Sequence, residues 1–259
     1  MATRTPFFIA ALLNAAVAVL VAIGLILPTP TEPAPERPSA TTSTVPTQEG
    51  RPEEQAEEAT PAPSIAPNIA EALAALESLE VKGRAPKTGY EREEFGQAWS
   101  DDVTVEFGHN GCDTRNDILR RDLDSESLVL KEGTHDCVAL SGTLHDPYSG
   151  QDIEFQRGAQ TSRAVQIDHV VPLADAWQKG AQQWSPEKRR DFANDPRNLL
   201  AVDGPLNQQK GAGDAATWLP PNKDFRCEYA RRIVEVKAAY ELWVTEAEKD
   251  ALSRLLNAC

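Results

Sequence analysis

Two stretches of the 259-residue sequence, QIDHVVP at 166–172 and NLLAVDGPLNQQK at 198–210, decide the fold of its central part. The first is rich in β-branched residues and ends at a proline, which predicts a strand over 164–171. The second predicts a short strand over 199–202, then an Asp-Gly-Pro turn and a helix that begins near Leu206. A strand, a second strand and a helix therefore follow one another, with an Asp-His pair at the end of the first strand.

These stretches resemble the core of the HNH endonucleases, which have a ββα-metal site. An Asp-His-x-x-Pro motif begins at Asp168, and two asparagines nine residues apart, Asn198 and Asn207, follow it. The sequence is most similar to the HNH domain at the C-terminus of the modification-dependent restriction enzyme GmrSD and to exported bacterial proteins that share it. The Asp-His and Asn–Asn pattern also resembles the HNH domain of CRISPR effector nucleases. The core resemblance covers residues 165–210, and a broader one runs over 90–259.

Phosphodiester hydrolysis needs a base that activates water and positive charge that neutralises the phosphoryl oxygens. A neutral imidazole suits the first task near pH 7, so we predict His169 as the general base. A single divalent cation, Mg²⁺ or Mn²⁺, suits the second, with Asp168 and the side-chain oxygen of Asn207 as its predicted ligands. The resemblance implies that Asn198 braces the hairpin loop, which makes His169, Asn198 and Asn207 the expected catalytic set. Lys210 lies one helical turn after Asn207 and is predicted to bind substrate phosphate.

One geometric difficulty accompanies this assignment. Neighbouring residues on a regular strand point to opposite faces, so Asp168 and His169 can address one metal only if the strand twists or ends there. Each residue also has a purely structural explanation, since Asn198 beside a proline could simply end a helix and Asn207 could be a first-turn helix residue. The functional hypothesis depends on the combination of these residues.

The remaining pattern predicts a mixed α+β domain. A helix is expected over 113–123, and short strands are expected over 128–130, 137–140 and 153–155. Four residues at helical spacing predict a further helix whose two tryptophans belong to the core: Leu173, Trp177, Ala181 and Trp184. A helix with one apolar face from Tyr229 to Tyr240 and a second that begins at Thr245 predict a C-terminal αα-hairpin. The fold class expected is therefore a ββα-metal nuclease core inside an α+β domain that disulfides staple.

The chain has four cysteines: Cys112, Cys137, Cys227 and Cys259. An even number in a chain that we expect to be exported predicts two disulfides, and three pairings are possible. Proximity in the sequence favours the first with the second and the third with the fourth. A zinc site is the alternative, but no two cysteines have the short spacing of a zinc knuckle.

The N-terminal part of the sequence predicts a location outside the cytoplasm. Residues 7–27 form an apolar run interrupted only by Asn14, long enough for a helix that crosses a membrane. We therefore expect residues 1–27 to be an uncleaved membrane anchor, with a cleaved signal sequence as the alternative. The positive-inside rule then places the C-terminal part beyond the membrane. Residues 28–67 are rich in Pro, Thr and Glu and predict a disordered linker, so the nuclease domain is assigned to 68–259.

Net charge limits the function. The formal net charge of −14 excludes a protein that coats nucleic acid by overall electrostatic attraction, although it permits a local binding site. Counted from the sequence, residues 68–149 carry −9 and residues 150–259 carry −1. The sequence thus predicts an extracytoplasmic, monomeric, metal-dependent endonuclease that cuts DNA, with RNA as the alternative substrate. The resemblance implies 5′-phosphate and 3′-hydroxyl ends.

Two other functions compete with this one. The acidic balance of residues 68–149 favours a non-catalytic extracytoplasmic interaction module displayed on the spacer. A phosphodiesterase for cell-envelope polymers would use the same site on a different substrate.

Overall fold

The structure is a computed structural model, and it describes residues 69–259. The predicted anchor or signal at 1–27 and the linker at 28–67 lie outside the described residues. Among the helices of 69–259, none has the length and apolar character needed to span a bilayer.

A two-stranded antiparallel sheet stands at the centre of the fold. Strand β4 (Val165–His169) pairs with β5 (Leu199–Asp203), with Asp168 opposite Leu200 and His169 opposite Leu199. The first four residues of β5, Leu199 to Val202, are apolar because both faces of the strand are buried there. Leu199 and Ala201 pack into one hydrophobic cluster, and Leu200 and Val202 pack into another on the opposite face.

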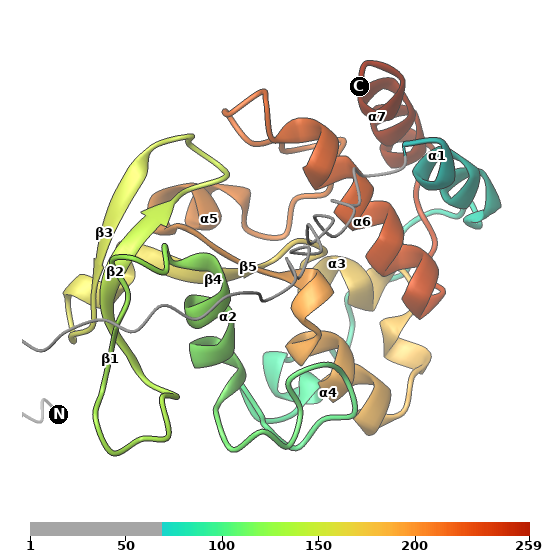
Figure 1. Cartoon of the computed structure of the whole chain (residues 1–259). Coiled ribbons are helices and arrows are strands. Elements are labelled where there is room, and N and C mark those ends of the chain that lie inside the picture. Colours follow the sequence, from blue (N-terminus) through green and yellow to red (C-terminus); the bar gives the residue numbers. More distant parts are fainter. Residues whose placement is uncertain (1–68) are drawn as a thin grey trace, which may run out of the picture. The chain divides into compact units, whose positions relative to one another are not determined.

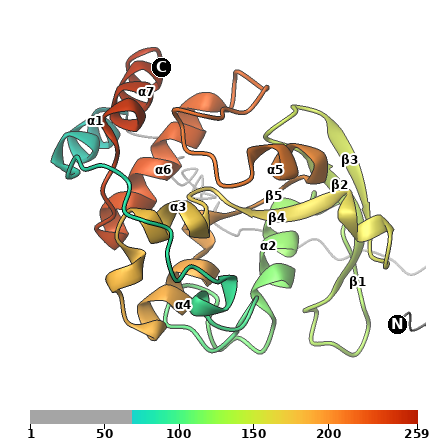
Figure 2. The ribbon, with the colours of Figure 1, turned by 180° about the vertical axis from the view of Figure 1, so that it is seen from behind.

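Helix α5 (Gly204–Lys210) follows β5 directly and packs against both strands, as Figure 2 shows from behind. It begins two residues before the predicted start, because the Asp203 side chain caps it by accepting a hydrogen bond from the Leu206 amide at 2.8 Å. Gly204 is required at this turn, since a Cβ there would lie 2.1 Å from the carbonyl oxygen of Arg163. The order of two strands and a helix predicted for this stretch is confirmed.

A second sheet lies at one end of the molecule, and a group of helices lies at the other, with β4 and β5 between them (Figure 1). The sheet has the antiparallel order β1 (Val129–Leu130), β2 (Ala139–His145) and β3 (Asp152–Gln156), and α2 (Thr114–Asp122) contacts β2 and β5. The other helices are α1 (Ile69–Ser78), α3 (Leu173–Gln178), α4 (Pro186–Asn194), α6 (Arg226–Tyr240) and α7 (Glu246–Asn257). Short 3₁₀ turns occur at Arg92–Phe95, Thr161–Arg163, Ala181–Gln183 and Pro196–Asn198. The α+β class is therefore confirmed.

The helix predicted from the spacing of Leu173 to Trp184 is divided in two. Helix α3 ends at Gln178, Gly180 adopts a φ of +132°, and a 3₁₀ turn follows. The apolar spacing survives because both segments face the same core, and Trp177 is buried as predicted. Periodicity alone did not show the interruption, since the glycine conformation breaks the helix without breaking the pattern.

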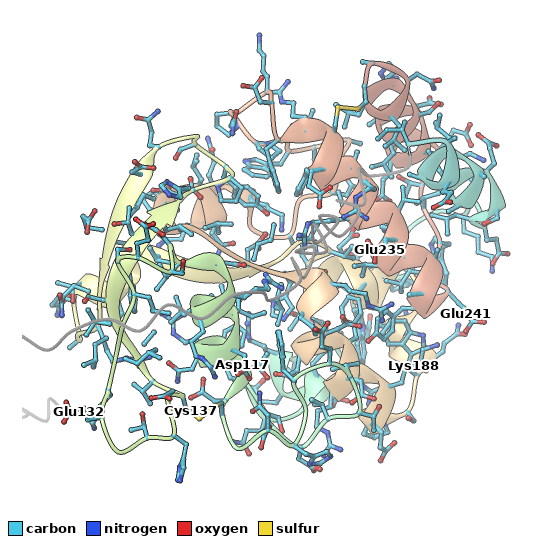
Figure 3. All side chains as sticks on the ribbon, viewed as in Figure 1. Asp117, Glu132, Cys137, Lys188, Glu235 and Glu241 are labelled. Atoms are coloured by element: carbon cyan, nitrogen blue, oxygen red, sulfur yellow. A yellow bond between two sulfur atoms is a disulfide. The ribbon has the colours of Figure 1, made fainter. Side chains whose placement is uncertain are left out.

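Two disulfides staple the domain at the cysteines predicted. Cys112 pairs with Cys137, which fastens the start of α2 to the segment before β2. Cys227 pairs with Cys259, which joins the start of α6 to the end of the chain beyond α7 (Figure 3). The pairing that proximity favours is confirmed, and so is the C-terminal αα-hairpin. Lys188 and Glu241, also labelled in Figure 3, form an ion pair at 3.2 Å that ties α4 to the end of α6.

A closed ion cluster lies inside the helical part. It consists of three cations and three carboxylates: Arg84, Asp175, Lys179, Asp214, Lys237 and Glu248. The Lys179 ammonium has no exposed surface and lies 2.7–2.9 Å from three of the carboxylates. Burial alone would lower the pKa of Lys179, but the charges of Asp175 and Glu248 outweigh it and raise this pKa. Helices α3, α6 and α7 are thereby joined through charge.

Candidate active site

A polar cleft of about 490 Å³ opens where β4 ends. It is lined by the end of β4, the start of α3, the outer face of α5 and two segments from earlier in the chain. The lining residues are Lys87, Tyr90, Arg92, Trp99, Arg115, Gln166, Ile167, Asp168, His169, Pro172, Leu173, Ala174, Asn207, Gly211 and Ala212. Three of the predicted site residues therefore share one cavity: Asp168, His169 and Asn207.

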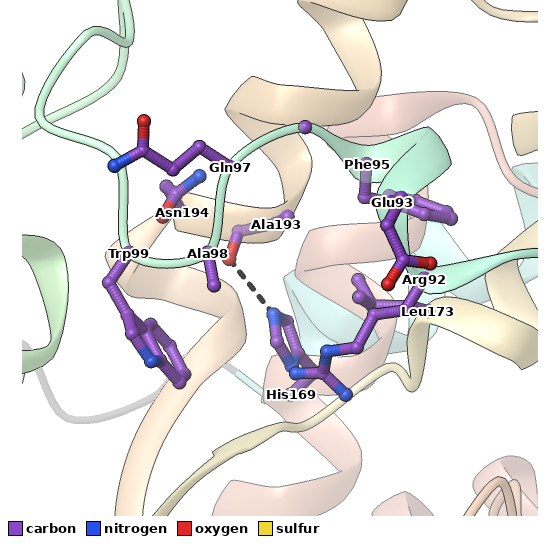
Figure 4. Close-up of a pocket in the computed structure, with 11 residues that line it drawn as sticks. Arg92, Glu93, Phe95, Gln97, Ala98, Trp99, His169, Leu173, Ala193 and Asn194 are labelled. Carbon is purple, nitrogen blue, oxygen red and sulfur yellow. Dashed lines mark hydrogen bonds between the residues drawn. The ribbon is translucent and has the colours of Figure 1, made fainter.

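His169 stands at the wall of the cleft and is largely buried, with 7% of its surface exposed. Its Nε2 lies 2.9 Å from the carbonyl oxygen of Ala193 in α4 (Figure 4). A carbonyl only accepts, so Nε2 carries the proton and Nδ1 keeps its lone pair. Burial, together with the positive charges of Arg92 and Lys210, lowers the pKa of His169 to about 3 against the opposing effect of the Ala193 carbonyl. The imidazole is therefore neutral over the physiological range.

Asp168 is held from two sides. The Tyr148 hydroxyl donates a hydrogen bond to its Oδ2 at 2.5 Å, and the Lys210 ammonium lies 2.8 Å from Oδ2 and 3.0 Å from Oδ1. Burial and the charge of Asp168 raise the pKa of Tyr148 well above its ordinary value, so this hydroxyl stays protonated as a donor. A carboxylate has about four acceptor positions, and these bonds leave acceptor capacity on Oδ1.

Asn207 projects from α5 beside Gln166 of β4. Its Nδ2 donates to the Gln166 Oε1 at 3.0 Å, which fixes the amide and leaves the Asn207 Oδ1 without a protein donor among the described residues. Asp168 and Asn207 thus bring one carboxylate and one amide oxygen to the same cleft.

Asn198 lies outside the cleft and is completely buried. Its Oδ1 accepts from the amide of Val171 at 2.8 Å, and its Nδ2 donates to the Val171 carbonyl at 3.3 Å. Its backbone carbonyl also accepts from the Val170 amide at 2.8 Å. These contacts hold the chain immediately after His169 against the start of β5.

Lys210 is placed differently from the prediction. Its side chain has no exposed surface, and its ammonium donates to Asp168 and, at 2.7 Å, to the carbonyl oxygen of His169. It therefore cannot reach a substrate phosphate in this arrangement. The helical spacing correctly predicted that Lys210 lies on the same face of the helix as Asn207. The side chain turns inward because it pairs with Asp168 on the neighbouring strand, and the sequence of the helix alone does not show that contact.

The two neighbours at the end of β4 point to opposite faces, as strand geometry requires. His169 lies on the face of α4 and Trp99, while Asp168 lies on the face of Tyr148 and Lys210. Both still line the cleft because the strand ends at His169 and the cleft opens at that end.

Sequence reasoning missed four residues of this site: Tyr148, Lys87, Arg92 and Arg115. Arg115 belongs to the stretch NGCDTRN at 110–116, within the broader resemblance, but no role followed from the sequence. In the described part of the chain, Lys87, Arg92 and Arg115 form no ion pair with any carboxylate. Only the packing of distant segments shows that all three face the cleft.

Residues 69–259 contain no group of three or more His, Cys, Asp or Glu side chains arranged to hold a metal. The oxygen donors that the cleft offers are the carboxylate of Asp168 and the amide of Asn207. This donor set is incomplete for a permanently caged ion, but it fits Mg²⁺ or Mn²⁺, which keep several water ligands and take others from a phosphate.

The fold and the cleft together define a class, an α+β domain in which a neutral imidazole and the side-chain oxygens of a strand and a helix line one cleft. Residues 113–255, more than half of the chain, match the family model described as the C-terminal domain of GmrSD restriction endonucleases. The chain therefore belongs to this family. It is also 40% identical over 207 residues to an uncharacterized secreted protein of Arthroderma benhamiae, covering 78% of this chain and 93% of that protein. No solved structure matches.

Proposed function

We propose that this protein is a metal-dependent HNH endonuclease that hydrolyses phosphodiester bonds of nucleic acid, DNA in the first place, outside the cytoplasm. The observation that carries the proposal is His169, a neutral imidazole with its Nδ1 lone pair available and with Asp168 and Asn207 in the same cleft. Membership of the restriction endonuclease family supports a nuclease function.

In this proposal β4, β5 and α5 form the ββα-metal core, and residues 68–259 form the nuclease domain around the core at 165–210. The antiparallel register places His169 opposite Leu199 at the start of β5, and α5 begins at the other end of the sheet and runs back so that Lys210 in its last turn reaches Asp168. Asn198 braces the chain beyond them, and α5 presents Asn207. Asp168, His169 and Asn207 line the cleft, and Asn198 holds the chain that follows His169.

Asp168 and Asn207 would hold the divalent cation, with Tyr148 and Lys210 orienting the carboxylate. The cation, when bound, would neutralise negative charge on the phosphoryl group. Lys210 also compensates the charge of Asp168 before a cation arrives, which allows this carboxylate to be buried without one.

His169 performs the proton transfer. Its Nδ1 takes a proton from a water molecule, and the oxygen of that water forms a bond to phosphorus while the bond to the 3′ oxygen breaks. The 3′ oxygen leaves with the bonding electron pair and takes a proton from solvent water. A positioned general base contributes about 10²–10⁴-fold to the rate and most when its pKa is near the working pH, so the lowered pKa of His169 favours the lower end of this range. The Ala193 carbonyl stabilises the resulting imidazolium, because it accepts from Nε2 throughout. The products carry 5′-phosphate and 3′-hydroxyl ends.

The charge of the cleft favours a polyanionic substrate, although the whole chain has a net charge of −14. Lys87, Arg92 and Arg115 line the cleft without a carboxylate partner among the described residues. Phosphate binding depends on such local cations and not on the total charge. The interaction module favoured by the acidic balance of 68–149 gives no reason for this concentration of unpaired cations beside a neutral histidine.

The test uses the purified full chain with supercoiled plasmid in Mg²⁺ or Mn²⁺. We expect nicking and linear product, complete inhibition by excess EDTA and a loss of at least about 100-fold in His169→Ala. His145→Ala is the matched control, because His145 is an exposed histidine that pairs with Asp152 far from this site. Cleavage that survives His169→Ala or EDTA would exclude the mechanism, and a wild-type protein that cuts neither DNA nor RNA would favour the interaction module.

The proposed location outside the cytoplasm is supported by the two disulfides and by similarity to a secreted protein. Whether residues 1–27 anchor the chain or are removed is tested by the mass of the mature protein. An intact N-terminus in the membrane fraction supports the anchor, and a shortened protein in the medium supports the signal sequence.

A further inference from the structure

A second cavity, of about 250 Å³, lies behind the wall that His169 forms (Figure 4). It is lined by the segment from Arg92 to Trp99 and by α3 and α4. We call it the side pocket, and its lining residues are Arg92, Glu93, Phe95, Gly96, Gln97, Ala98, Trp99, His169, Leu173, Ala193 and Asn194. The chemistry assigned to the cleft does not use this space.

The side pocket and the cleft share four lining residues: Arg92, Trp99, His169 and Leu173. A phosphate that reacts beside His169 Nδ1 is therefore within one nucleotide of the side pocket. If part of the same nucleic acid enters the side pocket, it must therefore be a group attached to the sugar-phosphate backbone next to that phosphate.

The composition of the side pocket fits a flat, partly polar group. Phe95, Leu173 and Ala193 supply apolar surface, and the partly buried Trp99 ring lies nearly parallel to the His169 imidazole, with 6.0 Å between centroids. Figure 4 shows Gln97 and Asn194 on one side and Glu93 on the other. Apolar walls with a few polar groups at the edge are typical of sites that stack and hydrogen-bond a nucleobase.

Two features show that these side chains are poised for a ligand. Asn194 is buried, and its Oδ1 has no hydrogen-bond partner in the described part of the chain, while its Nδ2 donates to the Arg190 carbonyl. Trp99 adopts a φ of +58°, which is costly for a bulky residue, and its carbonyl is held by the amide of Thr114. The loop is thereby fixed with the indole at the boundary between pocket and cleft.

We propose that the side pocket holds an unpaired nucleobase of the substrate, from a nucleotide adjacent to the phosphate that is cut. This inference rests on the proposed nuclease function and adds a substrate class to it. A base inside a duplex cannot enter such a pocket without leaving its partner and its stack. The enzyme should therefore prefer single strands, loops and mismatched sites to paired duplex.

The first experiment maps cleavage of a short single strand in Mn²⁺ against the same strand with one abasic residue. Stacking of a base on aromatic side chains is worth ~1–3 kcal/mol, so we expect one bond next to the abasic residue to be cut about 5–100-fold more slowly. The remaining bonds serve as the internal control. Equal cutting at every bond of the two strands would overturn the proposal.

The second experiment fills the side pocket. Ala98 lines it and is exposed, so Ala98→Trp adds a ring there without altering the core. We expect this variant to bring the rates at the intact and abasic bonds together. Ala239→Trp, on an exposed position of α6, should preserve the difference. A difference that survives Ala98→Trp would show that the base binds elsewhere.

The third experiment separates this inference from the proposed function. Binding of the two strands to the wild-type protein is measured by fluorescence anisotropy in EDTA, where no cleavage is required. A base-dependent affinity that Ala98→Trp abolishes supports the side pocket even if no strand is ever cut. Equal affinities for the intact and abasic strands would overturn it even if the protein proves to be a nuclease.

Discussion

Two regions of this molecule bury a lysine against a carboxylate, and they differ in what surrounds the pair. In the closed ion cluster, three cations meet three carboxylates, so the charges balance, and all of these side chains except that of Arg84 are buried. At the cleft, Lys210 neutralises Asp168, but three further cations face the same cavity without a carboxylate.

This difference distinguishes a structural role from a functional one. A balanced and largely buried set of charges holds its own elements together and leaves no net charge for an external ligand to neutralise. An unbalanced set beside a cavity keeps a net field that an anionic ligand can satisfy. Burial of a charged residue is therefore uninformative by itself, and the balance of charge around it is the useful observation.

The largest expected effect is on the closed cluster. Lys179→Met leaves Asp175, Asp214 and Glu248 short of one cation, and breaking a buried ion pair costs ~3–5 kcal/mol. We expect this loss in the free energy of unfolding, measured by urea denaturation at pH 7. The control is Lys249→Met, whose exposed pair with Glu77 should be worth at most ~1 kcal/mol. A variant as stable as the wild type would show that the cluster does not hold the helices.

Lys210→Met tests whether the Lys210–Asp168 pair at the cleft, unlike the closed cluster, can be replaced by a bound cation. The variant leaves Asp168 with only the Tyr148 donor, and we expect a loss of ~1–3 kcal/mol in the absence of metal. Mn²⁺ should restore part of this stability, because a cation at Asp168 replaces the missing ammonium. Thermal unfolding with and without Mn²⁺ measures the effect.

The matched comparison for that experiment is Lys179→Met, whose carboxylates are enclosed and should gain nothing from Mn²⁺. If Mn²⁺ stabilises neither variant, or both equally, Asp168 is not the metal ligand proposed.

The sequence predicted the central part of the fold well because local patterns encode it. The apolar run of β5, the Asp-Gly-Pro turn and the α5 helix are each determined by adjacent residues. The cysteine pairing also followed from short separations of 25 and 32 residues. The break between α3 and the following 3₁₀ turn did not, because Gly180 changes the backbone without changing the apolar period.

The site was predicted only as far as its motif extends. Asp168, His169 and Asn207 share a cleft because the two strands and the helix are consecutive. Tyr148, Arg92 and Arg115 come from segments 20 to 77 residues away from His169 or Asp168 in the sequence, and only tertiary packing brings them there. The inward turn of Lys210 has the same origin, since its partner lies 42 residues earlier.

Acid should destabilise the cleft before it destabilises the closed cluster. Burial lowers the pKa of His169 to about 3, so between pH 6.5 and 3 the unfolded chain binds a proton that the folded chain does not. Stability is therefore complete above pH 6.5 and falls as the pH drops, by ~1.4 kcal/mol at pH 5.5. In the closed cluster, burial alone would raise the pKa of Asp175, but the charges of Lys237 and Lys179 outweigh it and lower this pKa. The contribution of Asp175 to the free energy of unfolding is therefore lost only in more acidic solution.

Urea denaturation in EDTA from pH 8 to pH 4 measures how the free energy of unfolding changes over this range. His169→Gln should lack the loss between pH 6.5 and 5.5, while His145→Gln should retain it. The pKa of His145 is raised by its hydrogen bond to Asp152, so its contribution has the opposite sign and cannot imitate that of His169. If the free energy of unfolding of the wild type is unchanged down to pH 5, burial does not lower the pKa of His169 in the folded protein.

The smallest expected effect concerns the unbalanced cations themselves. Arg115 makes only a long contact, 3.5 Å, with the carbonyl oxygen of Val165, so Arg115→Ala should leave the free energy of unfolding within ~0.5 kcal/mol of the wild type. Its affinity for a single strand in EDTA should fall about threefold to tenfold, and the slope of log affinity against log salt should become shallower by ~0.7. Arg254→Ala is the control, since Arg254 is exposed on α7 and outside the cleft. An unchanged salt slope in Arg115→Ala would mean that Arg115 does not contact phosphate. The unpaired cations of the cleft would then have no demonstrated function, while the structural role of the closed cluster would be unaffected.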